Sequence, residues 1–296
     1  MIVMIFFVLF AGFSQENDQD SLQPLVHIGM DYVADTEFSY DDPSKWKDKY
    51  PNCAGESQSP VNIVTNVCEV LPKIQRKVKI TNADVRPETV ELLNDHYTVK
   101  YLLTWPEEYT PQISGAFLGP DRYIPRDIHF HWGREDAKGS EHSINSEKYS
   151  LEMHIVCYND KYKSVADAKF HNDGILVIAQ FFQAVSYAPN YFFLDLLPRI
   201  RENRSQINIR EKLCLYNLGE FLNVDSLVRG NFVTYNGSFT TPPCYEDVTW
   251  IVSLSVAPIE RRKMHMFRTT QGLRGQLLVD NCRPLQAINK RKCLKN

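Results

Sequence analysis

Short apolar runs, separated by polar and turn-forming positions, recur along most of this chain and predict β-strands. Such runs outnumber helical patterns, so strand signals dominate the sequence. Several runs are apolar throughout, as expected for strands that are covered on both faces of a sheet. The predicted strands are Val90–Leu93, Tyr97–Leu103, Ile128–Trp132, Met153–Tyr158, Ile175–Phe182 and Val248–Val256.

Helical patterns are limited to short segments. These segments are Val165–Phe170 and Tyr191–Leu197, and Pro198 ends the second because proline cannot continue a helix. Between residues 37 and 290 we find no linker, repeat or low-complexity tract. These observations predict one mostly β domain, of the mixed β/α type, in which a large sheet carries short peripheral helices.

The two ends of the chain differ from the rest. Met1–Phe13 is apolar, and the sequence turns polar at Ser14. This run is too short for a transmembrane helix, which needs about 20 apolar residues, but it fits the hydrophobic region of a signal peptide. We therefore expect a signal peptide over residues 1–14, a flexible lead-in over 15–36 and a basic, solvated tail over 291–296. The prediction is a secreted, extracellular protein without a membrane span.

Composition and charge exclude some classes of protein. The hydrophobic content of 43% is ordinary for a globular chain, and the net charge of -3 comes from interspersed acidic and basic residues, so we expect no nucleic-acid partner. The seven cysteines predict at least one disulfide in a secreted chain, and their odd number leaves a free thiol or an intermolecular bond. Asn203 and Asn236 each begin a sequon for N-glycosylation.

Three histidines form the most informative pattern. His129 and His131 are separated by one residue in a predicted strand, so their side chains share one face. His154 lies in another predicted strand. Three imidazoles with an open fourth position are the ligand set of a catalytic zinc site. A lone histidine is more often a hydrogen-bonded core residue, but the flanking sequence favours the metal site, and the absence of H-E-x-x-H argues against a zinc peptidase.

Six blocks, in order along the chain, resemble the α-type carbonic anhydrases from Tyr40 to about Lys290. The resemblance implies a single domain over residues 37–290, on a twisted, mostly antiparallel sheet of about ten strands. It also implies zinc at the bottom of a cleft and the reversible hydration of carbon dioxide to bicarbonate and a proton. The blocks are Gln58–Ile63, His129–Gly133, Gly139–His142, Glu152–His154, Gly237–Pro243 and Val279–Pro284.

The resemblance assigns the metal ligands and their supports. It implies that His129, His131 and His154 hold one Zn²⁺ ion, and that Glu152 accepts a hydrogen bond behind the third ligand. Behind the first ligand the family normally has a glutamine, and Asp127 stands there in this chain. A carboxylate is shorter and charged, so we expect altered zinc affinity. The alternative interpretation of Asp127 is a solvent-facing acid in a turn.

The resemblance also assigns the residues around the substrate. Thr240 matches the threonine that orients the nucleophile, and Glu141 matches the buried glutamate that accepts its hydrogen bond. Because an ionised carboxylate only accepts, Thr240 would point its proton at Glu141 and a lone pair at the nucleophile. Without the zinc motif, both would be interpreted as ordinary loop and surface residues. The apolar substrate wall is matched by Val156, Val177, Phe239, Val248 and Trp250, with Phe239 in place of the usual leucine, and Thr241 is also expected to bind the substrate.

The resemblance also assigns a residue that carries the released proton out of the site. His96 matches the family's proton shuttle, and an imidazole titrates in the range that such a relay needs. The next residue, Tyr97, is bulkier than usual and is expected to hinder the imidazole. His96 as a plain turn residue is the alternative. Tyr40 and Asn94 match residues that organise the connecting waters.

The cysteines lead to two expectations, a disulfide within the chain and a disulfide between two chains. The resemblance implies a disulfide between Cys53 and Cys244, and Cys293 is the candidate for a disulfide-linked dimer. No pairing is assigned to the remaining four cysteines, which are Cys68, Cys157, Cys214 and Cys282.

The competing function is a catalytically silent, secreted binding or matrix module. Silent relatives usually lose a zinc histidine, and this chain keeps all three.

Overall fold

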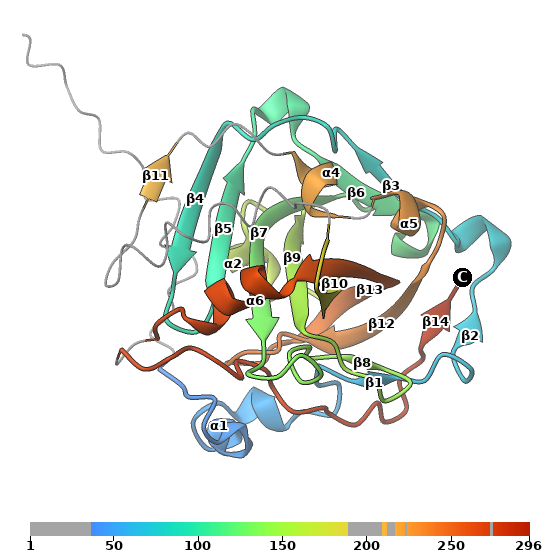
Figure 1. Cartoon of the computed structure of the whole chain (residues 1–296). Helices are drawn as coiled ribbons and strands as arrows, with labels where there is room; N and C mark the ends of the chain where they lie inside the picture. Colours follow the sequence, from blue (N-terminus) through green and yellow to red (C-terminus); the bar gives the residue numbers. More distant parts are fainter. Residues whose placement is uncertain (1–36, 189–208, 212–216, 223, 273–274) are drawn as a thin grey trace, which may run out of the picture.

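The computed structural model describes residues 37–188, 209–211, 217–222, 224–272 and 275–296. One large sheet crosses the molecule, and short helices lie around it (Figure 1). The strands are β1 Asn62–Ile63, β2 Glu69–Val70, β3 Val78–Thr81, β4 Thr89–Asn94, β5 Val99–Thr104, β6 Gln112–Gly115, β7 Tyr123–Trp132, β8 Ser143–Ile144, β9 Leu151–Asn159, β10 Ile175–Val185, β11 Ile209–Glu211, β12 Phe232–Ser238, β13 Glu246–Glu260 and β14 Leu294–Lys295. The helices are α1 Trp46–Lys49, α2 Val165–Ala168, α4 Leu218–Phe221, α5 Val224–Val228 and α6 Arg261–Arg268.

The main sheet runs in the order β11-β4-β5-β7-β9-β10-β13-β12-β14-β2, with β3 and β6 paired beside β7. Within it β10 pairs with β13 in parallel, as does β14 with β2, and the other pairs are antiparallel. The predicted mostly β fold on a large, mostly antiparallel sheet is therefore confirmed. Each predicted strand falls on an observed one, and α2 covers the first part of the expected helix Val165–Phe170. The expected helix Tyr191–Leu197 lies outside the described residues.

The two faces of β7 and β9 have different chemistry. Ile128 and Phe130 of β7, with Ile155 of β9, are fully buried in one hydrophobic cluster. Because neighbouring side chains in a strand alternate between faces, the intervening His129 and His131 point to the opposite side. The sheet thus carries a packed core on one face and a histidine site on the other.

Helix α6 covers the core face of the sheet (Figure 1). Its residues Met264 and Phe267 belong to the same hydrophobic cluster as Phe130, and the rings of Phe267 and Phe130 are 5.2 Å apart. This packing holds β7 from the side opposite the histidines. In the described part of the chain, no helix is both long enough and apolar enough to span a membrane.

The C-terminus differs from the expectation of a solvated basic tail. Residues 294 and 295 form β14, which pairs with β12 on one side and β2 on the other. Cys293 is joined to Cys68 by a disulfide within the chain, so the expected intermolecular bond through Cys293 is wrong. The strand pairing brings the two cysteines together, and this pairing could not be deduced from the sequence. The expected signal peptide and lead-in, residues 1–36, lie outside the described residues.

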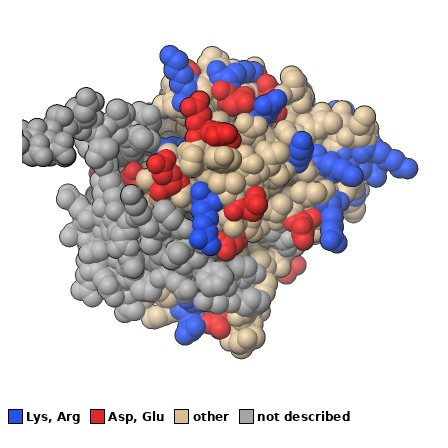
Figure 2. Space-filling model, turned by 90° about the horizontal axis from the view of Figure 1, so that it is seen from above, with Lys and Arg blue, Asp and Glu red and all other residues tan. Residues whose placement is uncertain are grey.

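Acidic and basic side chains are interspersed on the face shown in Figure 2. In the described part of the chain, acidic and basic side chains form pairs such as Lys161 with Asp173, and Arg268 with Asp136. Pairs of this kind at a surface contribute little to stability. The pattern agrees with the interspersed charges of the sequence.

Candidate metal centre and its cavity

Three histidines converge from two adjacent strands. His129 and His131 lie on β7, and His154 lies on β9 directly opposite His129 in the antiparallel ladder. One nitrogen of each ring lies within 4.8 Å of one nitrogen of each other ring. Nε2 of His129 and Nδ1 of His154 are 3.3 Å apart. The strand periodicity and the register of this one strand pair therefore build the histidine cluster.

The outer nitrogens of two rings contact buried carboxylates. Nδ1 of His129 lies 2.8 Å from Oδ1 of Asp127, and Nε2 of His154 lies 2.7 Å from Oε1 of Glu152. Asp127 is 3% exposed, so it is not a solvent-facing acid in a turn. Since an ionised carboxylate only accepts hydrogen bonds, each ring donates its N–H outward.

The third ring is held by the backbone. Nδ1 of His131 donates to the carbonyl oxygen of Asn281 over 2.8 Å. Nε2 of His131 is buried and has no hydrogen-bond partner among the described residues. The three outward hydrogen bonds leave one lone pair on each ring for the centre, on Nε2 of His129, Nε2 of His131 and Nδ1 of His154.

The charge state of the rings suits a metal. Burial lowers the pKa of His129, His131 and His154, and the neighbouring carboxylates only partly offset this effect. The neutral form is favoured, and a histidine must be deprotonated to bind a metal ion. Three neutral imidazoles, one of them with a buried nitrogen that lacks a partner, fit a zinc ion with an open fourth position.

Glu152 connects the third histidine to a hydrogen-bond network. Its Oε1 lies 2.6 Å from Nδ1 of His142, and its Oε2 accepts the backbone N–H of His142. Nε2 of His142 contacts the hydroxyl of Tyr235 at 2.6 Å. Burial alone would raise the pKa of Glu152, but His142 and His154 hold it well below the usual range. His142, Glu152 and His154 also form a compact group, but hydrogen bonds already use both nitrogens of His142 and both carboxylate oxygens of Glu152.

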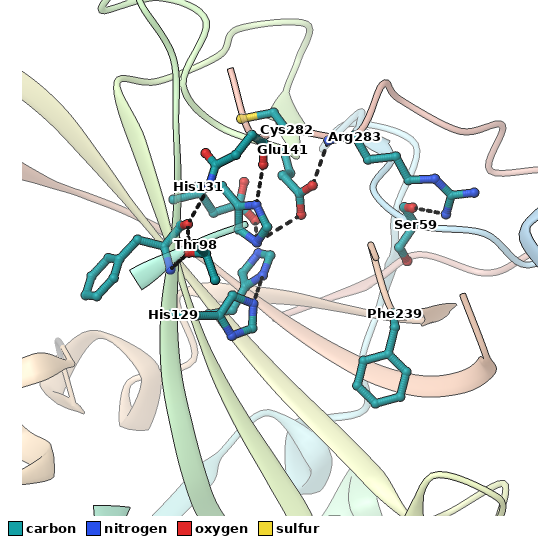
Figure 3. Close-up of polar contacts among 12 residues, drawn as sticks. Ser59, Thr98, His129, His131, Glu141, Phe239, Cys282 and Arg283 are labelled. Carbon is teal, nitrogen blue, oxygen red and sulfur yellow. Dashed lines mark hydrogen bonds and ion pairs between the residues drawn. The ribbon is translucent and has the colours of Figure 1, made fainter. Parts of the chain in front are cut away.

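Glu141 lies beside His131, as Figure 3 shows. Its Oε2 is 3.4 Å from Nε2 of His131, and its Oε1 accepts the backbone N–H of Arg283 over 2.8 Å. Oε2 is buried without a hydrogen-bond partner among the described residues. The hydrogen bond expected from Thr240 is therefore not formed in this structure. Glu141 keeps one acceptor atom free next to the histidine cluster.

A cavity of about 770 Å³ opens onto the three histidines. Val248, which was expected in its wall, is not among the lining residues and is completely buried in a hydrophobic cluster. Phe239 is on the wall and makes none of the polar contacts drawn in Figure 3. Thr240, expected as a catalytic residue, lines the cavity. The expected substrate residues that line it are Val156, Val177, Phe239, Thr241 and Trp250.

Tyr40 reaches the cavity from the N-terminal segment. Its ring lies edge-on to Phe38 and Trp46, both at 5.5 Å between ring centres. Its hydroxyl is buried and has no hydrogen-bond partner among the described residues. Burial, reinforced by the charge of Glu141, raises the pKa of Tyr40 well above its usual range, so the phenol stays protonated.

The turn between β4 and β5 departs from expectation. Asn94 and His96 are not among the residues that line the cavity, whereas Asp95 and Tyr97 are. The amide of Asn94 is used within the fold, because Nδ2 donates to the carbonyl oxygen of Gln271 and Oδ1 accepts the N–H of His96.

A disulfide fixes the loop that carries Thr240. Cys53 and Cys244 are bonded, as the resemblance implied, and they are 191 positions apart in the sequence. Closing so long a loop restricts the unfolded chain. Cys157 and Cys282 are free thiols.

Two of the residues singled out in the sequence lie outside the described residues, and three residues that form hydrogen bonds at the site were not predicted to do so. Cys214 and the sequon at Asn203 lie outside the described residues, whereas Asn236 is exposed on β12. His142 and Asn281 fall in blocks that carry the resemblance, but their roles become visible only through their contacts. Tyr235 gave no sequence signal, because a buried tyrosine in an apolar strand is unremarkable by pattern alone.

The known proteins that the sequence matches belong to one family. A sequence model of the family described as "Eukaryotic-type carbonic anhydrase" matches residues 41–296. Carbonic anhydrase 3 of Homo sapiens is 30% identical over 262 residues, covering 86% of this chain and 94% of the relative. Carbonic anhydrase 7 of Mus musculus is 29% identical over 259 residues, covering 85% and 92%. Carbonic anhydrase 6 of Mus musculus is 30% identical over 239 residues, covering 78% and 71%.

Proposed function

Because the chain belongs to the eukaryotic-type carbonic anhydrase family, we propose that it catalyses the reversible hydration of carbon dioxide to bicarbonate and a proton. One zinc ion would be held by His129, His131 and His154. The observation that carries this proposal is the convergence of three neutral ring nitrogens, each on a ring whose other nitrogen is held by an acceptor.

A zinc ion bound there would act as a Lewis acid and lower the pKa of a water molecule to about 7, an effect for which carbonic anhydrases are themselves the standard example. The protein's part is to keep the ligands neutral and fixed. Asp127, Glu152 and the carbonyl of Asn281 do this by holding the outer N–H groups. Rigidly oriented ligands preserve the geometry that leaves one coordination position open.

Glu141 and Thr240 orient the attacking oxygen. Oε2 of Glu141 is the free acceptor at the site, and the Thr240 hydroxyl is on the cavity wall. A hydroxyl that donates to Glu141 must offer a lone pair to the nucleophile, which fixes the direction from which it attacks. In this proposal the hydrogen bond between Thr240 and Glu141 forms in the working enzyme.

The apolar part of the cavity holds the substrate. Carbon dioxide has little to hydrogen-bond, so a wall of Val156, Val177 and Trp250 suits it. Phe239 adds a ring to this wall and limits the size of what fits beside the metal site. Carbon dioxide and bicarbonate are therefore the small-molecule partners that we assign.

We also propose that this protein is secreted. Two disulfides support it, because such bonds persist in oxidising compartments. Asn236 is exposed and available for glycosylation in that setting. Treatment of secreted protein with a glycosidase, followed by mass spectrometry, tests modification at Asn236.

Stopped-flow measurement of carbon dioxide hydration tests the proposed activity. The wild-type protein, reconstituted with zinc, should hydrate carbon dioxide well above the uncatalysed rate. His131→Ala removes the middle ligand and should lose both zinc and activity. A protein that binds one zinc ion and remains inactive would favour the silent binding module instead.

A further inference from the structure

The turn from β4 to β5 is locked by its own contacts. Oδ1 of Asp95 accepts the N–H groups of Tyr97 and Thr98, at 3.0 and 2.8 Å. Oδ2 of Asp95 lies 2.6 Å from Nζ of Lys100. His96 adopts a positive φ of 71°, which the N–H contact to Asn94 stabilises. These interactions fix which side chains of the turn face the cavity.

His96 does not face the cavity in this arrangement. It is absent from the cavity wall, and its Nδ1 is buried without a hydrogen-bond partner among the described residues. The amide of Asn94 ties the turn to Gln271, in the segment after α6. The contacts of Asp95 and Asn94 hold the backbone of the turn in this conformation.

Tyr97 lines the cavity instead, and it shares with Tyr40 a ring contact to Phe38. Its ring stacks on Phe38, with centroids 4.0 Å apart and planes 13° apart, and its hydroxyl accepts the N–H of Phe38. Phe38 in turn packs edge-on against Trp46. The stack is thus part of a small aromatic cluster that joins the N-terminal segment to the cavity wall.

The other groups on this wall are poorly suited to relay protons at neutral pH. Among the described residues, the only histidines on the wall are the three ligands. Burial opposes ionisation of Asp95, but Lys100 and two backbone N–H groups lower the pKa of this carboxyl, so it stays a fixed anion. Imidazole is the side chain that ordinarily changes charge between pH 5 and 8.

We propose that this chain exports protons without a histidine relay, because Tyr97, stacked on Phe38, occupies the cavity wall where a relay would stand and His96 faces elsewhere. The inference rests on the proposed hydration activity. Each turnover joins carbon dioxide and water and releases one proton. That proton leaves the oxygen for the nitrogen of a buffer base, forming a new N–H bond on the buffer. A cavity of about 770 Å³ has room for such a molecule.

The kinetic test compares four proteins in dilute and concentrated imidazole-type buffer. Wild-type kcat should rise several-fold with buffer concentration, and His96→Ala should follow the same curve. Tyr97→His should raise kcat several-fold in dilute buffer and leave kcat/KM unchanged. Tyr97→Phe, the matched control, keeps the stacked ring but adds no relay and should behave like the wild type.

The outcomes separate this inference from the proposed function. If His96→Ala lowers kcat in dilute buffer and added imidazole restores it, His96 is the relay and the inference is wrong. If wild-type kcat does not depend on buffer, the inference is also wrong. If no zinc-loaded protein hydrates carbon dioxide in any buffer, the proposed function itself fails.

A second readout does not depend on activity. In the zinc-free protein, nuclear Overhauser contacts should join the rings of Tyr97 and Phe38. None should join the imidazole of His96 to Tyr40. Contacts between His96 and Tyr40, with Tyr97 displaced from Phe38, would overturn the assignment.

Discussion

Asp127 accepts a hydrogen bond from Nδ1 of His129 over 2.8 Å, and its carboxylate is buried beside the histidine cluster. The strand places the two residues two positions apart, so both side chains lie on the same face. The carboxylate fixes the ring and increases the donor strength of its inner nitrogen. The contact therefore links a departure from the family's usual glutamine to the strength of zinc binding.

Removal of this acceptor should weaken zinc binding. Asp127→Ala is expected to lower zinc affinity about 10- to 100-fold, because His129 loses the group that holds its ring. Asp127→Gln retains an acceptor at this position and should keep more of the affinity than Asp127→Ala. Competition with a chelator of known affinity measures both variants. Equal affinity of Asp127→Ala and the wild type would show that the contact plays no part in metal binding.

Thr240 should be needed for rate and not for the metal. Thr240→Ala is expected to keep one zinc ion and to lose about 10²–10³-fold in hydration rate, the usual cost of removing one orienting hydrogen bond at a reacting oxygen. Thr240→Ser keeps the hydroxyl and should retain much of the activity. Stopped-flow rates and metal analysis on the same samples measure the effect. Full activity of Thr240→Ala would exclude Thr240 from the mechanism.

The two disulfides should be found intact and within one chain. Peptide mapping without reduction should recover Cys53 with Cys244 and Cys68 with Cys293. Replacing Cys53 and Cys244 by serine together should cost about 2–5 kcal/mol of stability, because the unfolded chain regains its freedom. Urea unfolding measures the loss. A Cys293 peptide linked to a second chain would contradict the structure.

Acid should destabilise the zinc-free protein through its buried histidines. Burial lowers the folded-state pKa of His129, His131 and His154 below the unfolded value of about 6.5. The unfolded chain therefore binds more protons below that pH, and stability falls as the pH drops from 7 towards 5. Each such histidine contributes up to about 1.4 kcal/mol per pH unit. Urea unfolding at pH 7.5 and pH 5.5 measures this, and unchanged or greater stability at pH 5.5 would refute the assignment.

The sequence predicts much of the histidine cluster because part of the information is local. His129 and His131 share a face by strand periodicity alone, and the resemblance adds His154. Their convergence, however, depends on the register of β7 against β9, which pairs His129 with His154. Register is a property of the folded sheet, and no single strand specifies it.

Other features depend on contacts that no pattern reports. The support of His131 is the backbone carbonyl of Asn281, and a carbonyl has no sequence signature. The pairing of Cys68 with Cys293 follows from the place of β14 in the sheet. The orientation of His96 follows from a positive φ and the hydrogen bonds of its turn, which the alternation of polar and apolar residues does not encode.

Titration of the metal-free protein with zinc, followed by carbon dioxide hydration at each step, tests the central claim most directly. The hydration rate should rise in proportion to added zinc and stop rising at one equivalent per chain. Full occupancy of the site at one equivalent, with hydration no faster than in buffer alone, would contradict it.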